Sequence, residues 1–284
     1  GRDEKILIDV KRAGGRDVSV NGEKCPSLGD FLARFPCMVL AADDISVVRG
    51  SPALRRRLLD LHFSSSRAGY YDALRRYYRG LAARNRLLKK EAPSELIRAH
   101  DHPLSEVAAR VVSHRQEGTA DLAPRFEEAF SRISGGLDEP GLHLRSSFDA
   151  SEADEIRALW EKGKERDRFL GSTQSGPHRD DWSFQTESGD ARDFASDGQQ
   201  RNLAVALKLT LFQDLQERTG ENPVLLADDV LGELDSRRKQ AFWNCLPESC
   251  QIIATGTEFS AESHPGNWEV FEVRQGTFQK EQPS

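Results

Sequence analysis

Long hydrophobic runs, paired cysteines and a phosphate-binding loop are all missing from these 284 residues. The longest apolar runs, near residues 37–42 and 224–227, are far shorter than the ~20 residues that a membrane-spanning helix needs. We therefore expect no membrane partner.

Cysteine is scarce, and its spacing argues against two classes of site. The four cysteines stand at positions 25, 37, 245 and 250, with no C-x-x-C spacing and no histidine cluster beside them. Neither a zinc site nor a disulfide framework is indicated by this pattern. We expect four reduced thiols and a cytoplasmic protein.

The net charge of -6 conceals a strongly basic segment. Residues 51–90 contain eleven lysines and arginines against Asp60 and Asp72, so this segment carries +9 and the rest of the chain -15. All four tyrosines of the chain lie in the same segment. Because the charge is sorted in this way, the negative total does not exclude a nucleic-acid partner.

The basic segment has helical periodicity from about residue 52 to residue 90. An apolar stripe contains Tyr70, Tyr77 and three leucines, which favours the core as the place of both tyrosines. Basic residues on the opposite face could follow a phosphate backbone, which dominates affinity for DNA; a solvated charged face is the alternative. With two arginines further upstream, the DNA-binding candidates are Arg55, Arg56, Arg75, Arg79, Arg86 and Lys90.

Apolar periodicity and turn residues divide the rest of the chain into strands and helices. Expected strands cover residues 5–10, 17–20, 36–42, 141–148, 181–187, 191–194, 224–227, 251–254 and 269–273. Further helices are expected at 94–115, 122–133, 151–169, 198–218 and 236–246. We interpret the chain as an α/β domain formed by residues 1–60 and 171–284, with a mostly helical arm, residues 61–170, inserted into it.

The stretch 194–235 carries the strongest functional signal. Ser196 and Gly198 begin a helix whose N–H groups can face a phosphate. A buried strand then ends in Asp228 and Asp229, and carboxylates held at a strand's end suit Mg²⁺. The motif G-x-x-x-x-G-K-[ST], which would complete such a nucleotide site, occurs nowhere in the chain.

Four ordered motifs run through the chain. They are Gly50-Ser51-Pro52-x-x-Arg55-Arg56-Arg57-x-Leu59-Asp60, Gly176-Pro177-His178-Arg179-Asp180-Asp181, Ser196-x-Gly198-Gln199-Gln200-Arg201 with Ala206-Leu207-Lys208-Leu209, and Asp228-Asp229-Val230-x-x-Glu233-Leu234-Asp235-x-x-Arg238. In this order they resemble the RecF family, the SMC-like ATPases of bacterial recombinational repair, over roughly residues 36–260. The resemblance implies an ABC/SMC-type ATPase head with an inserted arm.

The third motif resembles the signature motif of that family. The resemblance implies that Ser196, Gly198 and Gln199, with Gln200 beside them, contact the γ-phosphate of an ATP bound to the other subunit.

The fourth motif resembles the family's acidic site. Asp228 corresponds to the carboxylate that supports Mg²⁺, Asp229 to the one that orients the attacking water, and Asp235 to a residue that faces the dimer partner. For residues 178–181, a structural ion-pair cluster and an ATP contact both stay open.

Some positions depart from the family pattern. Asp197 stands where glutamine is usual and brings a carboxylate close to a phosphate site. Gly232 replaces a common serine, and residues 254–257 only approximate a threonine-rich switch. The family's phosphate loop belongs upstream of Lys5, so we do not expect these residues alone to hydrolyse ATP.

Two functions follow as hypotheses. The resemblance implies an ATP-dependent DNA-binding protein of recombinational repair and replication restart, which binds duplex DNA near single-strand junctions as an ATP-sandwiched dimer. ATP and Mg²⁺ would be its cofactors only with the missing phosphate-loop segment supplied, and RecR and RecO its partners. The alternative is a truncated, non-catalytic DNA-binding or dimerisation module derived from such an ATPase.

Overall fold

The computed structural model describes residues 3–12, 15–135, 140–148, 150–228, 236–247, 249–256 and 267–280. Its strands are β1 (Ile6–Val10), β2 (Arg16–Val20), β3 (Glu23–Lys24), β4 (Cys37–Ala41), β5 (Gly141–Arg145), β6 (Asp181–Thr186), β7 (Gly189–Asp190), β8 (Val224–Asp228), β9 (Ile252–Thr255), β10 (Phe271–Arg274) and β11 (Thr277–Lys280). Its α-helices are α1 (Leu28–Arg34), α2 (Ser46–Arg49), α3 (Pro52–Ser66), α4 (Tyr70–Lys89), α5 (Ser94–Ser134), α6 (Ala153–Lys162), α7 (Lys164–Leu170), α8 (Ala191–Phe194), α9 (Asp197–Thr219) and α10 (Ser236–Asn244). Two 3₁₀ turns, η1 (Ala42–Ile45) and η2 (Pro177–Arg179), complete the set.

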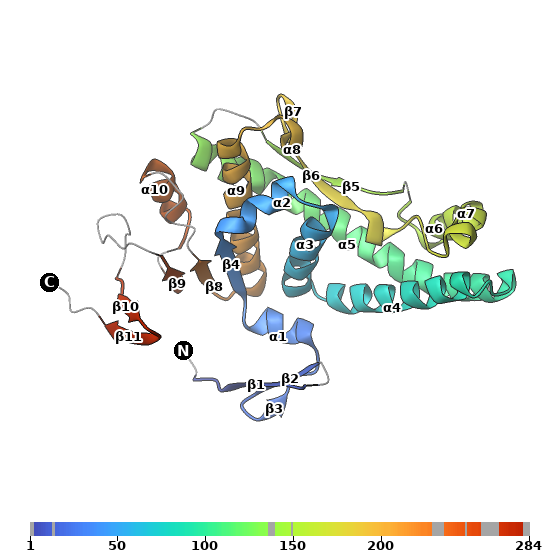
Figure 1. Ribbon diagram of the computed structural model, residues 1–284, viewed down its shortest axis with the longest axis horizontal. Helices are drawn as coiled ribbons and strands as arrows, with labels where there is room; N and C mark the ends of the chain where they lie inside the picture. Colours follow the sequence, from blue (N-terminus) through green and yellow to red (C-terminus); the bar gives the residue numbers. More distant parts are fainter. Residues whose placement is uncertain are drawn as a thin grey trace.

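A short parallel sheet, in the order β4-β8-β9, stands at the centre of the α/β part (Figure 1). Ala41 pairs with Asp228 and Asp228 with Thr255, so all three strands end at the same edge. Helix α9 packs beside this sheet, and its buried Lys208 donates a 2.7 Å hydrogen bond to the carbonyl of Val39. The same ammonium pairs with Asp44 at 2.8 Å, which fixes α9 against β4 and the turn after it.

The arm extends away from this sheet and is built on α4 and α5 (Figure 1). The antiparallel sheet β5-β6-β7 lies along α5, and α6 and α7 lie near the arm's outer end. The predicted place of the two arm tyrosines is confirmed, since Tyr70 and Tyr77 are fully buried. None of the described helices combines the length and the apolar character that crossing a bilayer requires.

The arm contains one helix where the sequence predicted two. Residues 94–115 and 122–133 belong to a single helix, α5, which passes through Pro103 and Pro124. Both prolines lie on the exposed side, where a missing backbone hydrogen bond leaves a carbonyl that water can reach. The opposite side of α5 is buried against α4, α9 and β5, so packing overrides the local breakers.

Four other predicted elements were wrong in extent or type. The helix of residues 52–90 is divided at Gly69, which has φ +80° and begins a new helix. Gly163 likewise divides the helix predicted at 151–169. Residues 191–194 form the short helix α8 instead of a strand, and a hairpin, β10-β11, replaces the single last strand.

Candidate nucleotide and DNA site

The start of α9 is closed by a reciprocal cap. Ser196 accepts a 3.3 Å hydrogen bond from the Gln199 N–H, and the Gln199 side chain accepts one of 2.9 Å from the Ser196 N–H. This is the capping box that Ser-x-x-Gln predicts. Gly198 lies in the exposed first turn, so its N–H belongs to the positive end of the helix dipole.

The unusual carboxylate of Asp197 has a cationic partner. Arg49, at the end of α2, forms an ion pair with Asp197 and donates a second hydrogen bond to the amide oxygen of Gln200. A guanidinium beside the carboxylate offsets its charge near the helix start. The predicted electrostatic penalty of Asp197 is therefore reduced by a residue that no sequence pattern linked to it.

Gln200 is directed into the protein. Its amide nitrogen donates to the carbonyls of Ala191 and Ala195 at 2.9 and 3.0 Å, and the side chain is buried. In this conformation it holds α8 against α9, and its amide is not presented to a ligand. We therefore leave Gln200 out of the nucleotide contacts proposed below.

Asp228 lies where the prediction placed it, at the carboxyl end of β8. The carboxylate is exposed and accepts a 2.5 Å hydrogen bond from the Thr255 hydroxyl at the end of β9. The described residues contain no group of three or more histidine, cysteine or acidic side chains that could hold a metal. One carboxylate and one hydroxyl suit a Mg²⁺ ion whose other ligands are water and nucleotide phosphate.

Two members of the predicted acidic site, Asp229 and Asp235, lie outside the described residues. Among the residues that are described, Asp228 makes no hydrogen bond or ion pair with Ser196, Gly198 or Gln200. The helix start and the strand end are thus two separate features, each with its own local partners.

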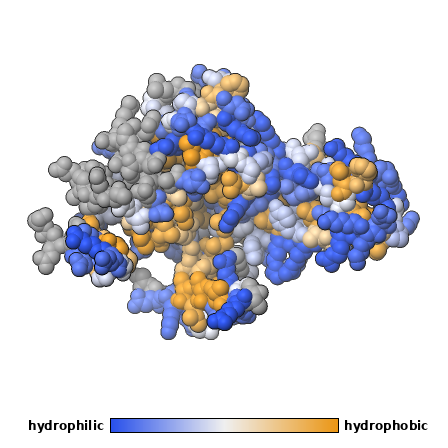
Figure 2. All heavy atoms as spheres, in the orientation of Figure 1, coloured by the Kyte–Doolittle hydropathy of each residue, from blue (hydrophilic) through white to orange (hydrophobic). Residues whose placement is uncertain are grey.

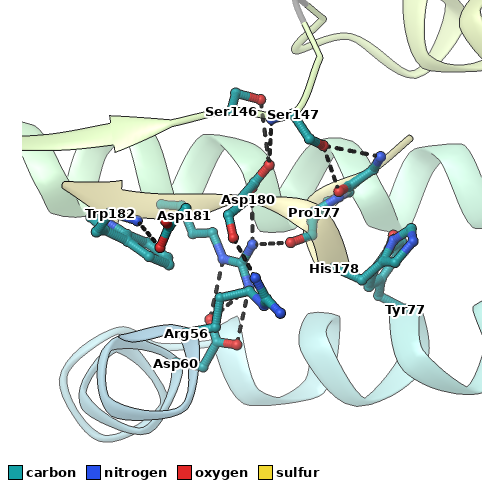
Figure 3. A network of polar contacts seen from close by, with 12 residues as sticks. Arg56, Asp60, Tyr77, Ser146, Ser147, Pro177, His178, Asp180, Asp181 and Trp182 are labelled. Carbon is teal, nitrogen blue, oxygen red and sulfur yellow. Dashed lines mark hydrogen bonds and ion pairs between the residues drawn. The ribbon is translucent and has the colours of Figure 1, made fainter. Parts of the chain in front are cut away.

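The Gly176–Asp181 motif builds the junction between arm and head (Figure 3). Asp180 is buried and pairs at 2.9 Å with Arg115 of α5, whose guanidinium also pairs with Asp60 at 2.8 Å and reaches the Pro177 carbonyl. The Arg115 guanidinium lies over the Trp182 ring, 5.2 Å from its centroid. Buried charges require such complete pairing, and the motif therefore serves as a structural cluster here.

The two upstream arginines differ in exposure. Arg55 is only 3% exposed, forms an ion pair with Asp181 at 2.7 Å and donates to backbone carbonyls of α2. Its guanidinium is inside the protein, so we remove it from the predicted DNA contacts. Arg56 is half-buried and donates a 2.6 Å hydrogen bond to the carbonyl of Asp180.

The basic face of α4, defined as Arg75, Arg79, Arg86 and Lys90 just after its end, is exposed along its length. None of these four side chains makes an ion pair with any residue that the structure describes. By contrast, exposed arginines such as Arg98 and Arg132 have acidic partners at 2.9 and 2.6 Å. Hydrophilic residues dominate the arm in the view of Figure 2.

Sequence reasoning missed the buried arginines Arg84 and Arg115. Arg84 pairs with Asp101 and Asp167 at 2.7 and 2.6 Å and lies 5.2 Å from the Trp160 ring centroid. Its place on the apolar stripe of α4, between Tyr77 and Leu88, was a usable signal. An arginine on a buried stripe predicts a paired, structural guanidinium.

Comparison with known proteins assigns the chain to a family. No protein-family model matches it. Curated relatives named DNA replication and repair protein RecF include those of Synechococcus sp. (strain CC9605), 32% identical over 95% of this chain and 77% of the relative, and of Myxococcus xanthus (strain DK1622), 33% identical over 92% and 71%.

Solved structures agree. The recombination mediator protein RecF, solved with ATP in the RecFOR pathway, is 30% identical over 98% of this chain and 76% of that chain, with a TM-score of 0.87. The likeness extends over the whole described fold and confirms the α/β head of the ABC/SMC ATPase type. The boundaries proposed for head and arm stay a prediction. The chain belongs to the RecF family of DNA replication and repair proteins.

Proposed function

We propose that this chain binds DNA along the basic face of α4, and that ATP controls this binding. The observation that carries the proposal is the row Arg75, Arg79, Arg86 and Lys90, which is exposed and without ion pairs inside the described residues. Unpaired cations in a row can follow a phosphate backbone and release its counterions. Duplex DNA near a single-strand junction is the proposed substrate. Side chains that contact phosphates sense charge and shape and carry no information on base sequence, so we expect the binding to depend on the structure of the DNA.

ATP is proposed to lie between two copies of the chain. The start of α9, with Ser196, Gly198 and Gln199, offers N–H groups to a phosphate held by the partner copy. Asp228, with Thr255 beside it, would hold Mg²⁺ on the chain's own nucleotide. The solved relative, RecF with ATP, supports this part of the proposal.

The partners follow from the same relatives. The solved structures are described as members of the RecFOR pathway, and we propose RecO and RecR as the proteins that act with this chain. Roles in recombinational repair and in replication restart belong to this proposal.

DNA binding is tested by fluorescence anisotropy with a labelled duplex that ends in a single-stranded tail, over a series of salt concentrations. The variant R75Q/R79Q/R86Q is expected to bind at least tenfold more weakly and to lower the salt slope by roughly 2 to 3, since each phosphate contact contributes about 0.9. The matched control R16Q/R166Q/R192Q removes three exposed arginines on β2, α7 and α8 that make no ion pair within the described residues. Equal losses in both variants would refute the assignment of α4.

Nucleotide binding is tested by calorimetric titration with ATP and Mg²⁺, together with sedimentation velocity, on the chain joined to a G-x-x-x-x-G-K-[ST] segment placed upstream of Lys5. Heat of binding and dimer formation that are both lost in D228N would support the sandwich. A chain that binds DNA but shows no ATP binding would favour the alternative, a non-catalytic DNA-binding or dimerisation module.

A further inference from the structure

A hollow of about 300 Å³ opens between the first turns of α4 and the middle of α5. Its walls are formed by Asp72, Ala73 and Arg76 of α4 and by Val107, Arg110 and His114 of α5. The motifs of the nucleotide site contribute none of these residues. The volume matches the lower end of the range for small-ligand sites.

The hollow is basic, and its cations lack protein partners. Arg76 and Arg110 are exposed, come from different helices and make no ion pair among the residues that the structure describes. Asp72 is the acidic member of the lining, so the side chains sum to +1 with His114 neutral. Two guanidiniums that face one space from two helices form the arrangement that a phosphate group accepts.

His114 supplies a third donor at the wall of the hollow. Its ring meets Tyr70 edge-on, with centroids 5.6 Å apart and planes at 81°. Neither ring nitrogen makes a hydrogen bond to another described residue. Burial lowers the pKa of His114, Glu117 raises it in part and Arg67 lowers it further. Because an anion beside the ring would favour the imidazolium, occupancy of the hollow should raise this pKa.

We propose that the hollow binds one phosphate group of a nucleic-acid backbone, held by Arg76, Arg110 and His114. The inference rests on the proposed function. Arg76 follows Arg75 in the sequence and lies one helical turn before Arg79. The hollow therefore adjoins the basic face of α4, and a phosphate bound in it would extend the row of phosphate contacts along this face. An acidic segment of a partner protein would use the same cations, but the paired guanidiniums and the small volume favour a single tetrahedral anion.

The pKa of His114 is the first readout, measured by NMR titration of the imidazole proton and assigned with H114Q. We expect it to rise by at least 0.5 units with a 20-base-pair duplex and, at millimolar concentration, with inorganic phosphate. Asp72, Arg76, Arg110, Glu117 and Arg67 are the charged groups around the ring, so R76Q/R110Q should abolish the response. A response to phosphate alone, or to poly-glutamate but not DNA, would overturn the nucleic-acid assignment.

DNA affinity gives the second readout. R76Q/R110Q is expected to bind the duplex at least threefold more weakly and to lower the salt slope by about 1, the value for one phosphate. The control R166Q/R192Q removes the same charge from α7 and α8. If R75Q/R79Q/R86Q weakens binding while R76Q/R110Q behaves like its control, the hollow is refuted and the proposed function stands. If only R76Q/R110Q weakens binding, the α4 proposal fails and the hollow stands.

Discussion

A neutral imidazole is held at the junction of arm and head. His178 Nδ1 lies 2.7 Å from the Tyr77 hydroxyl (Figure 3). Its Nε2 lies 3.0 Å from the carbonyl oxygen of Thr173. A carbonyl can only accept, so Nε2 carries the hydrogen and Nδ1 accepts from the hydroxyl. Burial lowers the pKa of His178 to about 4; the Thr173 bond opposes this shift, and Arg179 and Arg56 add to it.

This pKa predicts a pH-dependent stability. Between about pH 6.5 and pH 4 the unfolded chain binds a proton at His178 that the folded chain does not, so the free energy of unfolding falls as pH is lowered. The slope from this group is at most about 1.4 kcal/mol per pH unit. Urea unfolding at pH 7 and pH 5 should show a shallower pH dependence for His178→Gln than for the wild type.

His143→Gln provides the control, because His143 is exposed on β5. Its pH dependence should follow that of the wild type. Identical slopes for His178→Gln and His143→Gln would show that the junction histidine does not resist protonation.

At the scale of an element, the corner between α3 and α4 depends on one backbone conformation. Gly69 has φ +80° and caps the start of α4. An added Cβ would meet no atom within 4 Å, so a substitution there has a backbone cost and no steric one. Gly69 also lines the proposed phosphate hollow, which makes this corner relevant to both packing and binding.

Gly69→Ala is expected to lower the free energy of unfolding by about 1 kcal/mol, because alanine is strained at positive φ. Gly69→Asn should cost less, since asparagine enters the left-handed region more readily. Chemical denaturation of the two variants measures the difference. Losses of equal size for both side chains would mean that the corner relaxes to another conformation.

At the scale of the whole molecule, arm and head share one apolar core. A single cluster of buried side chains joins Phe63 of α3, Phe130 of α5, Trp182 of β6, Leu207 of α9 and Phe242 of α10. Helix α5 belongs to the arm by sequence, yet it packs along α9 of the head. Separating the two parts would expose this shared surface.

We therefore expect one cooperative unfolding transition. Far-ultraviolet circular dichroism and tryptophan fluorescence should give coincident curves in guanidinium chloride. Trp160 on α6 and Trp182 on β6 both belong to this core, so W160F and W182F separate the signal of the arm helix from that of the sheet. An earlier transition seen only by Trp160 would instead show that residues 61–170 unfold independently.

Local sequence determined the elements that carry the proposed nucleotide contacts. Ser196 and Gln199 lie three residues apart and satisfy each other's backbone groups, so the start of α9 could be predicted without the fold. The run before Asp228 is apolar enough to specify a buried strand, and the end of that strand places the carboxylate at the sheet edge.

Tertiary structure decided the roles of the charged residues, because the partner of a charge is set by distance in space. The sequence predicts Arg55 as a DNA contact, but in the fold Asp181, 126 residues away, lies beside it. The exposed arginines of α4 carry the same guanidinium group as Arg55, but they have no such acidic partner within the described chain. Burial makes an ion pair necessary, and exposure leaves a cation available to a ligand.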